Sequence, residues 1–236
     1  MRKLVIGVDL GGTKILAGIA DTNGAILEKK RIPTPVGAVP DQVLDMIIEC
    51  IRELQRACQV QEQEIKGVAV ASPGPLSFPE GVVRDSPNLG WAWVNFKDEL
   101  IRRTGRPVIV EKDTNMAVLG EYYFGRQRGC GDLLYITVST GVGGGVVCAG
   151  ELYRGHLGGA GEIGHMVVAA GGAACNCGRR GCLEALASGS AITRRLDEMV
   201  KQGQGQGILK YTTPGEHPGP RELGIAVRQG DQEARL

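Results

Sequence analysis

The stretch 162–184 carries the residue types with the clearest chemistry. It contains one histidine and three closely spaced cysteines, namely His165, Cys175, Cys177 and Cys182. Three thiolates and one imidazole complete the tetrahedral ligand set of a structural zinc ion and leave no open position for catalysis. The pattern therefore predicts a zinc ion that holds the chain together. Two interpretations compete with it: reduced thiols without a metal, and a zinc-ribbon module for nucleic acid, which the scarcity of clustered basic residues disfavours.

Two carboxylates flank this set. Glu162 lies just before His165, and Glu184 follows Cys182 by two positions. A metal ion bound by the histidine and the cysteines would hold both carboxylates near one place. These two acids, rather than the metal, are therefore the groups that we expect to meet a ligand.

Two glycine-rich turns are candidate phosphate-binding loops: DLGGTK at 9–14 and STGVGGG at 139–145. Turns without β-carbons let backbone N–H groups approach phosphate oxygens, and a neighbouring hydroxyl or ammonium adds donors. Asp9, at the end of a predicted strand, could hold Mg²⁺ through water. The alternative is a plain hairpin turn, but two such turns in one chain favour phosphate. Neither turn has the Walker A pattern.

Asp113 is a further candidate because it follows a predicted strand and opens a predicted helix. The commoner role of aspartate at this position is to cap the helix. The functional alternative is a general base whose position is fixed by the start of the helix. The residues alone favour the cap.

Composition excludes several classes of protein. The 236 residues carry a net charge of +1 and no basic run, which argues against nucleic acid and anionic membranes as partners. No apolar stretch approaches the roughly 20 residues that a membrane helix needs, and no signal-peptide pattern is present. Seven cysteines, four of them scattered through apolar segments, fit a reducing compartment, so we expect a cytoplasmic protein.

Hydrophobic periodicity and turn residues predict an alternation of strands and helices that positions these groups. We expect a helix from an N-cap at Asp41, a surface excursion over 81–91 and a flexible loop over 202–220. The other predicted strands are 3–8, 15–20, 25–32, 67–71, 107–111, 133–139 and 143–148, and the other predicted helices are 97–104, 113–125, 183–187 and 190–200, with a helical tendency over 221–236.

The order of the motifs resembles the ROK family (repressors, open reading frames and sugar kinases), especially its bacterial glucokinases. The resemblance covers residues 3–200, and the last two motifs together are highly specific. The matching motifs are DLGGTK at 9–14, SPGPL at 72–76, SPNLGW at 86–91, EKDTNMAVLGE at 111–121, STGVGGG at 139–145, GEIGHM at 161–166 and CNCGRRGCLEALASG at 175–189.

This resemblance implies an α/β protein with the actin-like ATPase (ribonuclease H-like) fold and two lobes around a cleft. We place an N-terminal lobe at 1–112 and a larger lobe at 113–236 whose C-terminal part is missing. The implied activity is ATP-dependent phosphorylation of a hexose at the 6-hydroxyl, with glucose as the leading substrate. The implied partners are a sugar, ATP with Mg²⁺ and structural Zn²⁺. We expect a homo-oligomer, a dimer or tetramer, with neither nucleic acid nor membrane as partner.

The resemblance also implies residue roles. Asp113 would be the base that takes the proton from the sugar hydroxyl. The zinc ligands would be the histidine and three cysteines named above. The sugar would contact Gly74, Asn88, Lys112, Glu162, His165 and Glu184. The phosphates and their Mg²⁺ would contact Asp9, Gly11, Gly12, Thr13, Lys14, Thr140 and Gly141.

Two departures from the family pattern bear on activity. Lys112 stands where many family glucokinases carry an asparagine that binds the sugar, so N-acetylmannosamine or another hexose is an alternative substrate. A cation at this position would also tend to lower the pKa of the neighbouring Asp113. The chain is shorter than family members, which predicts a truncated product with impaired nucleotide binding, or a sugar- and zinc-binding remnant without turnover.

Overall fold

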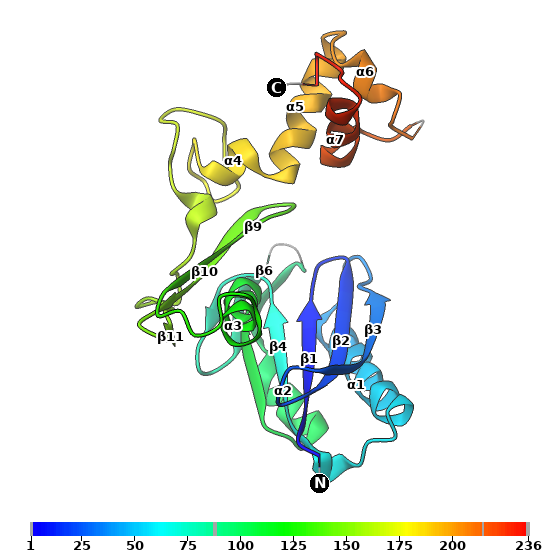
Figure 1. Ribbon diagram of the computed structural model, residues 1–236, viewed down its shortest axis with the longest axis vertical. Coiled ribbons are helices and arrows are strands. Elements are labelled where there is room, and N and C mark those ends of the chain that lie inside the picture. Colours follow the sequence, from blue (N-terminus) through cyan, green and yellow to red (C-terminus); the bar gives the residue numbers. More distant parts are fainter. Residues whose placement is uncertain (1, 87–88, 214, 235–236) are drawn as a thin grey trace. The chain divides into compact units, whose positions relative to one another are not determined.

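The computed structural model describes residues 2–86, 89–213 and 215–234 (Figure 1). Contacts divide the chain into two compact units. The first comprises Met1–Leu134 and Gly145–Ala160, and the second comprises Tyr135–Gly144 and Gly161–Leu236. The predicted boundary between the lobes, after residue 112, falls within the first unit, and that division of domains stays a prediction.

The first unit is built on a five-stranded sheet with the order β3-β2-β1-β4-β8. The predicted N-terminal meander is confirmed, since β1 pairs antiparallel with β2 and β2 with β3. β4 and β8 extend the sheet in parallel on the other side of β1. The strands are β1 (Leu4–Leu10), β2 (Lys14–Asp21), β3 (Ile26–Pro33), β4 (Ile65–Ser72) and β8 (Val108–Lys112).

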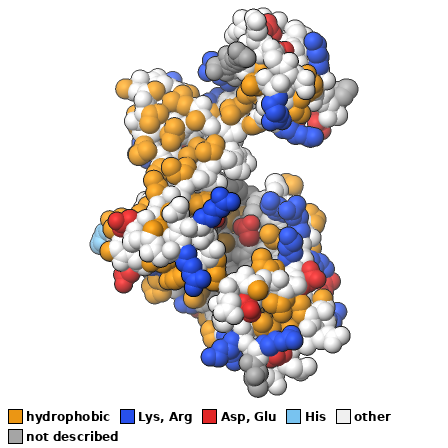
Figure 2. All heavy atoms as spheres, in the orientation of Figure 1, with side chains coloured by type: hydrophobic (Ala, Val, Ile, Leu, Met, Phe, Trp, Pro, Cys, Tyr) orange, Lys and Arg blue, Asp and Glu red, His pale blue; other side chains and the backbone are white. Residues whose placement is uncertain are grey.

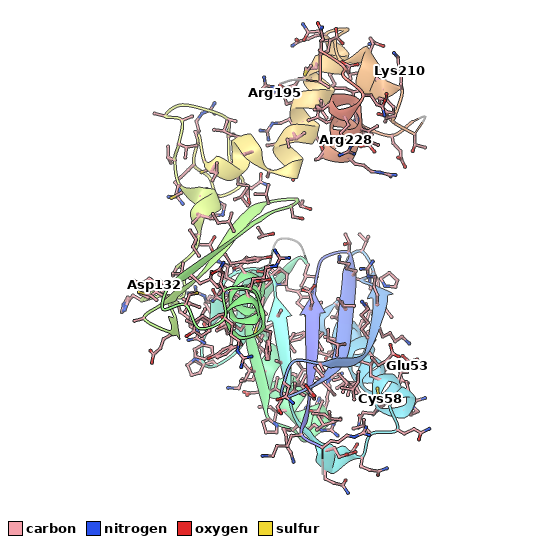
Figure 3. The ribbon with its side chains drawn as sticks, in the orientation of Figure 1. Glu53, Cys58, Asp132, Arg195, Lys210 and Arg228 are labelled. Carbon is pink, nitrogen blue, oxygen red and sulfur yellow. The ribbon has the colours of Figure 1, made fainter. Side chains whose placement is uncertain are left out.

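Helix α1 (Pro40–Ala57) packs its apolar face on this sheet. The predicted helix is confirmed, but the predicted cap is wrong: the N-cap is Val39, not Asp41. A proline fits the first helical position because it has no N–H to leave unpaired, so the helix starts two residues earlier than predicted. Glu53 of this helix, which Figure 3 labels, pairs with Lys30 of β3.

A small antiparallel sheet lies where we predicted a surface excursion, so that prediction is wrong. Its strands are β5 (Leu76–Ser77), β6 (Val82–Ser86) and β7 (Trp91–Asn95). Trp91 is 4% exposed, and its Nε1 donates a hydrogen bond of 2.9 Å to the Ala38 carbonyl. The prolines and glycines of this stretch read as loop residues, but its strands bury apolar side chains in the main core. Helix α2 (Phe96–Thr104) follows directly.

Helix α3 (Asp113–Phe124) leads to a second sheet with the order β11-β10-β9. Its strands are β9 (Leu133–Val138), β10 (Val142–Cys148) and β11 (Glu151–Leu152), and the boundary between the units runs through β9 and β10. The Asp132 carboxylate, which Figure 3 labels, accepts a hydrogen bond of 2.8 Å from the Ala149 N–H and closes the turn after β10.

The second unit is mainly helical. After the short turn η2 (Ile163–His165) come α4 (Leu183–Ala187), α5 (Gly189–Lys201), α6 (Gln206–Leu209) and α7 (Pro220–Arg228). The predicted helices over 183–187 and 190–200 are confirmed. The loop predicted over 202–220 contains α6, whose Ile208 is buried against Leu196 of α5 and Ala226 of α7. Within the described ranges, no helix is long and apolar enough to cross a membrane.

Candidate functional site

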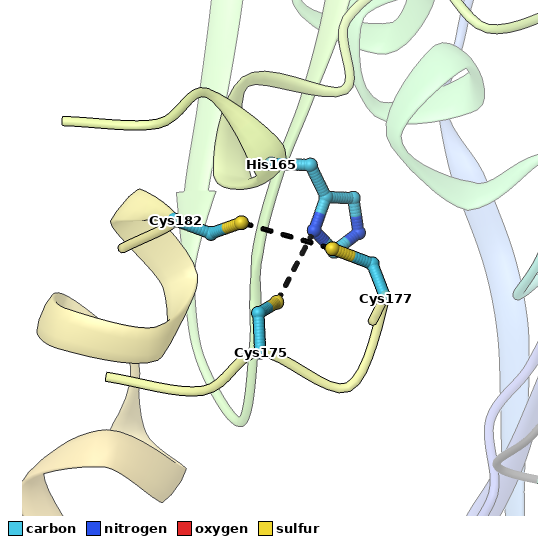
Figure 4. Close-up of side chains that lie close together, drawn as sticks. All are labelled: His165, Cys175, Cys177 and Cys182. Carbon is cyan, nitrogen blue, oxygen red and sulfur yellow. Dashed lines mark hydrogen bonds between the residues drawn. The ribbon is translucent and has the colours of Figure 1, made fainter. Parts of the chain in front are cut away.

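The histidine and the three cysteines lie together in the second unit (Figure 4). Their ligand atoms all lie within 4.8 Å of one another. Cys175 Sγ is 3.7 Å from His165 Nδ1, and Cys177 Sγ is 3.7 Å from Cys182 Sγ. Zinc–sulfur bonds of about 2.3 Å in a tetrahedron place two sulfurs roughly 3.8 Å apart. The four side chains therefore fit a tetrahedral zinc ion.

Tight backbone turns hold the cysteines in this arrangement. The Cys175 N–H donates a hydrogen bond of 2.8 Å to the Arg179 carbonyl, and the Gly178 N–H donates one of 3.0 Å back to Cys175. Gly178 has φ of 84° and Gly181 has φ of 73°, a region that glycine enters freely. A β-carbon at Gly181 would lie 1.7 Å from the Ala169 carbonyl oxygen. The glycines of the motif are thus needed for its geometry.

The sulfur environments differ. Hydrogen bonds from the backbone and side chain of Arg179 lower the pKa of Cys177 to about 6, because they stabilise its thiolate. Burial raises the pKa of Cys182 to about 11. Zinc binds cysteine as thiolate. A bound dication would supply the attraction that the buried Cys182 sulfur needs to lose its proton.

His165 lies between the sulfurs and the first of the flanking acids. Its Nδ1 faces Cys175, and its Nε2 lies 3.8 Å from Glu162 Oε2. The Glu162 side chain is 45% exposed, against 27% for the histidine. One ring nitrogen therefore faces the sulfurs and the other faces the Glu162 carboxylate, and the predicted roles of His165 stay a prediction.

Glu184, the second flanking acid, lies in the first turn of α4 and contacts the glycine-rich turn 139–145. One carboxylate oxygen accepts a hydrogen bond of 3.0 Å from the Val142 N–H. A β-carbon at Gly141 would lie 2.5 Å from the same carboxylate, and one at Gly164 would lie 2.0 Å from the Val142 carbonyl oxygen. Two motifs that are distant in sequence therefore pack closely inside the second unit.

A cavity of about 680 Å³ lies beside this turn, within the second unit. The start of α5 forms one wall: the Gly189 N–H donates to the Ser139 carbonyl at 2.7 Å, and Ser190 Oγ donates to the Thr140 carbonyl at 2.6 Å. The next two N–H groups of α5 are also paired, since Ser190 N–H donates to the Thr140 carbonyl at 3.2 Å and Ala191 N–H donates to Ser188 Oγ at 3.1 Å. The cavity is lined by Val138, Ser139, Thr140, Gly189, Ser190, Ile192, Thr193, Arg194, Asp197 and Pro220.

The surface around the cysteine cluster combines exposed apolar side chains with the exposed Arg179 and Arg180. Met166, Val167 and Val168 are each more than half exposed, at 52%, 52% and 55%. Figure 2 shows mostly apolar and uncharged side chains on the visible face of this segment.

In the first unit, the other predicted residues gather at one edge of the five-stranded sheet. Asp9 of β1 is level with Ala71 of β4, which is level with Glu111 of β8. Gly74 follows β4 with φ of 90°, and Asp113 follows β8. The carboxyl ends of parallel strands are where open α/β sheets bind ligands.

Asp113 is exposed and is the first residue of α3, whose N-cap is Lys112. Its Oδ1 accepts a hydrogen bond of 2.7 Å from the Thr114 N–H. The N-cap position that the sequence favoured for Asp113 therefore belongs to the residue before it. A carboxylate at this place can accept a proton from a bound hydroxyl.

The glycine turn at 11–14 is a tight hairpin between β1 and β2. The Gly11 N–H donates a hydrogen bond of 2.9 Å to the Lys14 carbonyl, and Thr34 Oγ1 donates one of 2.8 Å to the Gly11 carbonyl. Thr13 and Lys14 are exposed at its tip. The predicted sugar contact Asn88 lies outside the described residues.

Sequence reasoning missed an ion pair near Asp113 that joins a buried carboxylate to the half-buried Arg154. Glu111 is 4% exposed, and its Oε2 lies 2.7 Å from Arg154 Nε. The signal was a carboxylate near the end of an otherwise apolar strand, which requires a buried partner. The sequence does not reveal that this partner lies 43 residues further on.

The strand order β3-β2-β1-β4-β8 and the similarity to the proteins named here identify the actin-like ATPase fold. The sequence profile of the ROK family matches residues 5–235, and the chain belongs to this family. It is 42% identical to the glucokinase of Thermotoga maritima over 238 residues, covering 100% of this chain and 74% of that protein. It is 36% identical to the N-acetylmannosamine kinase of Escherichia coli over 94% of this chain and 74% of that protein.

A solved structure extends the likeness to three dimensions. A ROK family glucokinase from Streptomyces griseus, crystallised with glucose and AMPPNP, superposes with a TM-score of 0.81. It is 34% identical to this chain, and the match covers 98% of this chain and 73% of that one. The predicted fold class and family are thereby confirmed.

Proposed function

We propose that this protein transfers the terminal phosphoryl group of ATP to the 6-hydroxyl of a hexose, with glucose as the leading substrate. The observation that carries the proposal is the likeness to the Streptomyces griseus glucokinase, whose crystals hold glucose and an ATP analogue. The Thermotoga maritima glucokinase adds support, because it aligns with the full chain at 42% identity.

Asp113 is the proposed base. Its exposed carboxylate at the start of α3 would take the proton of the sugar 6-hydroxyl. The oxygen then attacks the terminal phosphorus, the bond to the bridging oxygen breaks, and ADP leaves. The protein's main contributions are to hold the two substrates in line and to accept the proton.

Both glycine-rich turns are proposed phosphate contacts. In the first unit these are Gly11, Gly12, Thr13 and Lys14, and in the second they are Thr140 and Gly141. The cavity of about 680 Å³ beside Thr140 offers room for the nucleoside. Asp9 would hold Mg²⁺ through water, and that ion would neutralise charge on the phosphates.

Sugar recognition is proposed for Glu162, His165 and Glu184, because hydroxyls need carboxylate and imidazole partners of fixed position. Gly74, Asn88 and Lys112 are the other proposed contacts. Structural zinc, bound by the histidine and the three cysteines, would supply rigidity to this segment. We also propose a cytoplasmic homo-oligomer acting in glycolysis. The seven cysteines are all free, which suits a reducing compartment.

N-acetylmannosamine is the second candidate substrate, favoured by Lys112 in place of the usual asparagine and by the 36% identity to a kinase of that sugar. An ADP-release assay over glucose, mannose, fructose and N-acetylmannosamine tests both candidates, with Asp113→Asn as the background control. We expect the highest kcat/KM with glucose. The Lys112→Asn variant should raise the preference for glucose if Lys112 contacts the sugar. If the protein binds sugar but releases no more ADP than the Asp113→Asn variant, it is a sugar-binding protein without kinase activity.

A further inference from the structure

Glu111 is a buried carboxylate two residues before Asp113. It is 4% exposed and lies near the carboxyl end of β8, where Val108 and Val110 belong to the core of the first unit. An ionised carboxylate is costly to bury unless it is paired and hydrogen-bonded. The contacts of Glu111 must therefore offset the cost of burying its charge.

Those contacts enclose the junction between β8 and α3. Glu111 Oε1 accepts a hydrogen bond of 2.9 Å from the Lys112 N–H, just before Asp113. The same oxygen accepts one of 3.0 Å from Asn115 Nδ2, two residues after Asp113. The backbone that carries Asp113 is thus tied to one buried acceptor on both of its sides.

The other oxygen of Glu111 connects the junction to the segment after β11. Arg154 Nε donates to Glu111 Oε2 at 2.7 Å, and the Arg154 guanidinium lies 3.8 Å from the centre of the Phe78 ring. Stacking on an aromatic ring restricts where a guanidinium can point. Arg154 therefore offers its N–H to Glu111 from a fixed direction.

A fourth contact holds the first turn of α3 from the side of β10. A β-carbon at Gly145 would lie 2.4 Å from the Thr114 carbonyl oxygen and 2.9 Å from Val118 Cγ1. The strand can approach α3 this closely only because glycine lacks a side chain. All of these contacts lie within the first unit.

We propose that Glu111, Arg154 and Asn115 are positioning residues that fix the direction of the Asp113 carboxylate. They act through Asp113 and touch neither sugar nor nucleotide. The inference rests on the proposed function, in which Asp113 is the base. A carboxylate that is misplaced by about 1 Å loses much of its effect on rate, while binding of the sugar, which has several other contacts, is preserved.

The test compares Arg154→Met, Glu111→Gln and the double variant with the wild type. We expect each single variant to lower kcat about 10- to 100-fold, with the sugar KM and the calorimetric sugar Kd within about threefold of wild type. The double variant leaves no unpaired buried charge, so its melting temperature should recover towards wild type. Its kcat should stay low, because the link from the junction to the segment after β11 is still missing. Arg154→Lys keeps the charge and should recover part of the rate.

Arg103→Met is the matched control. Arg103 is also an ion-paired arginine of the first unit, 18% exposed, and its partners Asp41 and Asp45 lie on α1. This variant should lose stability and keep kcat within about twofold. The positioning role is wrong if Arg103→Met lowers kcat as much as the Arg154 and Glu111 variants do for the same loss of melting temperature. It is also wrong if kcat returns together with stability in the double variant.

Asp113→Asn, run beside these variants, separates the two proposals. Turnover retained in Asp113→Asn would show that Asp113 is not the base. If Asp113→Asn is inactive and Arg154→Met keeps full kcat, only the positioning role is wrong. Amide hydrogen exchange over residues 112–116 needs no turnover. It should speed up in Arg154→Met and stay unchanged in Arg103→Met, and equal exchange in both variants would contradict the proposal.

Discussion

Asp113 and Glu184 each lie in the first turn of a helix, but different forces hold them. Around Asp113, the Glu111–Arg154 ion pair joins residues that are 43 positions apart in the chain. Glu184 follows a cysteine of the predicted zinc site by two positions and accepts a hydrogen bond from the Val142 N–H. The first acid is held by buried side chains of the folded unit. The second depends on a ligand cluster that a metal would complete.

This difference has a practical consequence. Removing a metal should disturb Glu184 and leave Asp113 in place, whereas breaking the ion pair should do the reverse. The first change is expected in sugar affinity and the second in the rate of the chemical step.

Asp113→Asn removes the proposed base and keeps the shape of the side chain. A positioned general base contributes roughly 10²- to 10⁴-fold to rate, so kcat should fall by that factor. The sugar Kd from calorimetry should change by no more than a few-fold, because hydrogen bonds to the other hydroxyls remain. A variant with more than a tenth of wild-type kcat would show that Asp113 is not the base.

Cys177→Ser removes one predicted zinc ligand from the cluster next to Glu184. Metal analysis should show the zinc content falling from one per chain towards zero, and the sugar KM should rise at least about tenfold. Cys130→Ser is the matched control, because Cys130 lies outside the cluster. Well-folded wild-type protein without zinc would contradict the proposed structural role of the metal. A rise in KM with unchanged zinc content would place the effect on Cys177 itself.

The same contrast explains what the sequence could and could not predict. The cluster of His165 and three cysteines, the glycine turns and most helices could be predicted, because their residues are close in sequence or regularly spaced. The Glu111–Arg154 pair joins β8 to the segment after β11, and no local pattern links those residues. The small sheet around Trp91 was missed for a related reason. Its turn residues predict loop, and the burial of Trp91 depends on a carbonyl at Ala38.

Helix boundaries show a finer limit. The sequence placed caps at Asp41 and Asp113 because aspartate is a common N-cap. In the structure the caps are Val39 and Lys112, and both aspartates lie in the first turn instead. A carboxylate is favourable in either place, because the first turn also carries the positive end of the helix dipole. Residue preference alone does not distinguish the two positions.

Gly141→Ala tests the Glu184 side of the comparison without touching the cysteines. The added β-carbon would lie 2.5 Å from the Glu184 carboxylate, which must move and loosen its hydrogen bond to Val142. Because the contact is the end of a flexible side chain, we expect a several-fold rise in sugar KM with zinc content unchanged. Gly131→Ala is the control, since a β-carbon there has no neighbour within 4 Å. Equal KM values in the two variants would mean that Glu184 does not hold the sugar.

His217→Ala should have the smallest effect and supplies a reference for the others. His217 Nδ1 lies 2.8 Å from Asp197 Oδ1, which is as close as the contacts around Glu111, but the histidine is 76% exposed. Exposed pairs contribute roughly 0–1 kcal/mol, so the free energy of unfolding from urea titration should fall by less than about 1 kcal/mol. If this variant lowers kcat as much as Arg154→Met does, burial is not what makes the junction contacts effective. A small change of kcat in His217→Ala, together with a large one in Arg154→Met, would indicate that the rate depends on the contacts around the buried Glu111.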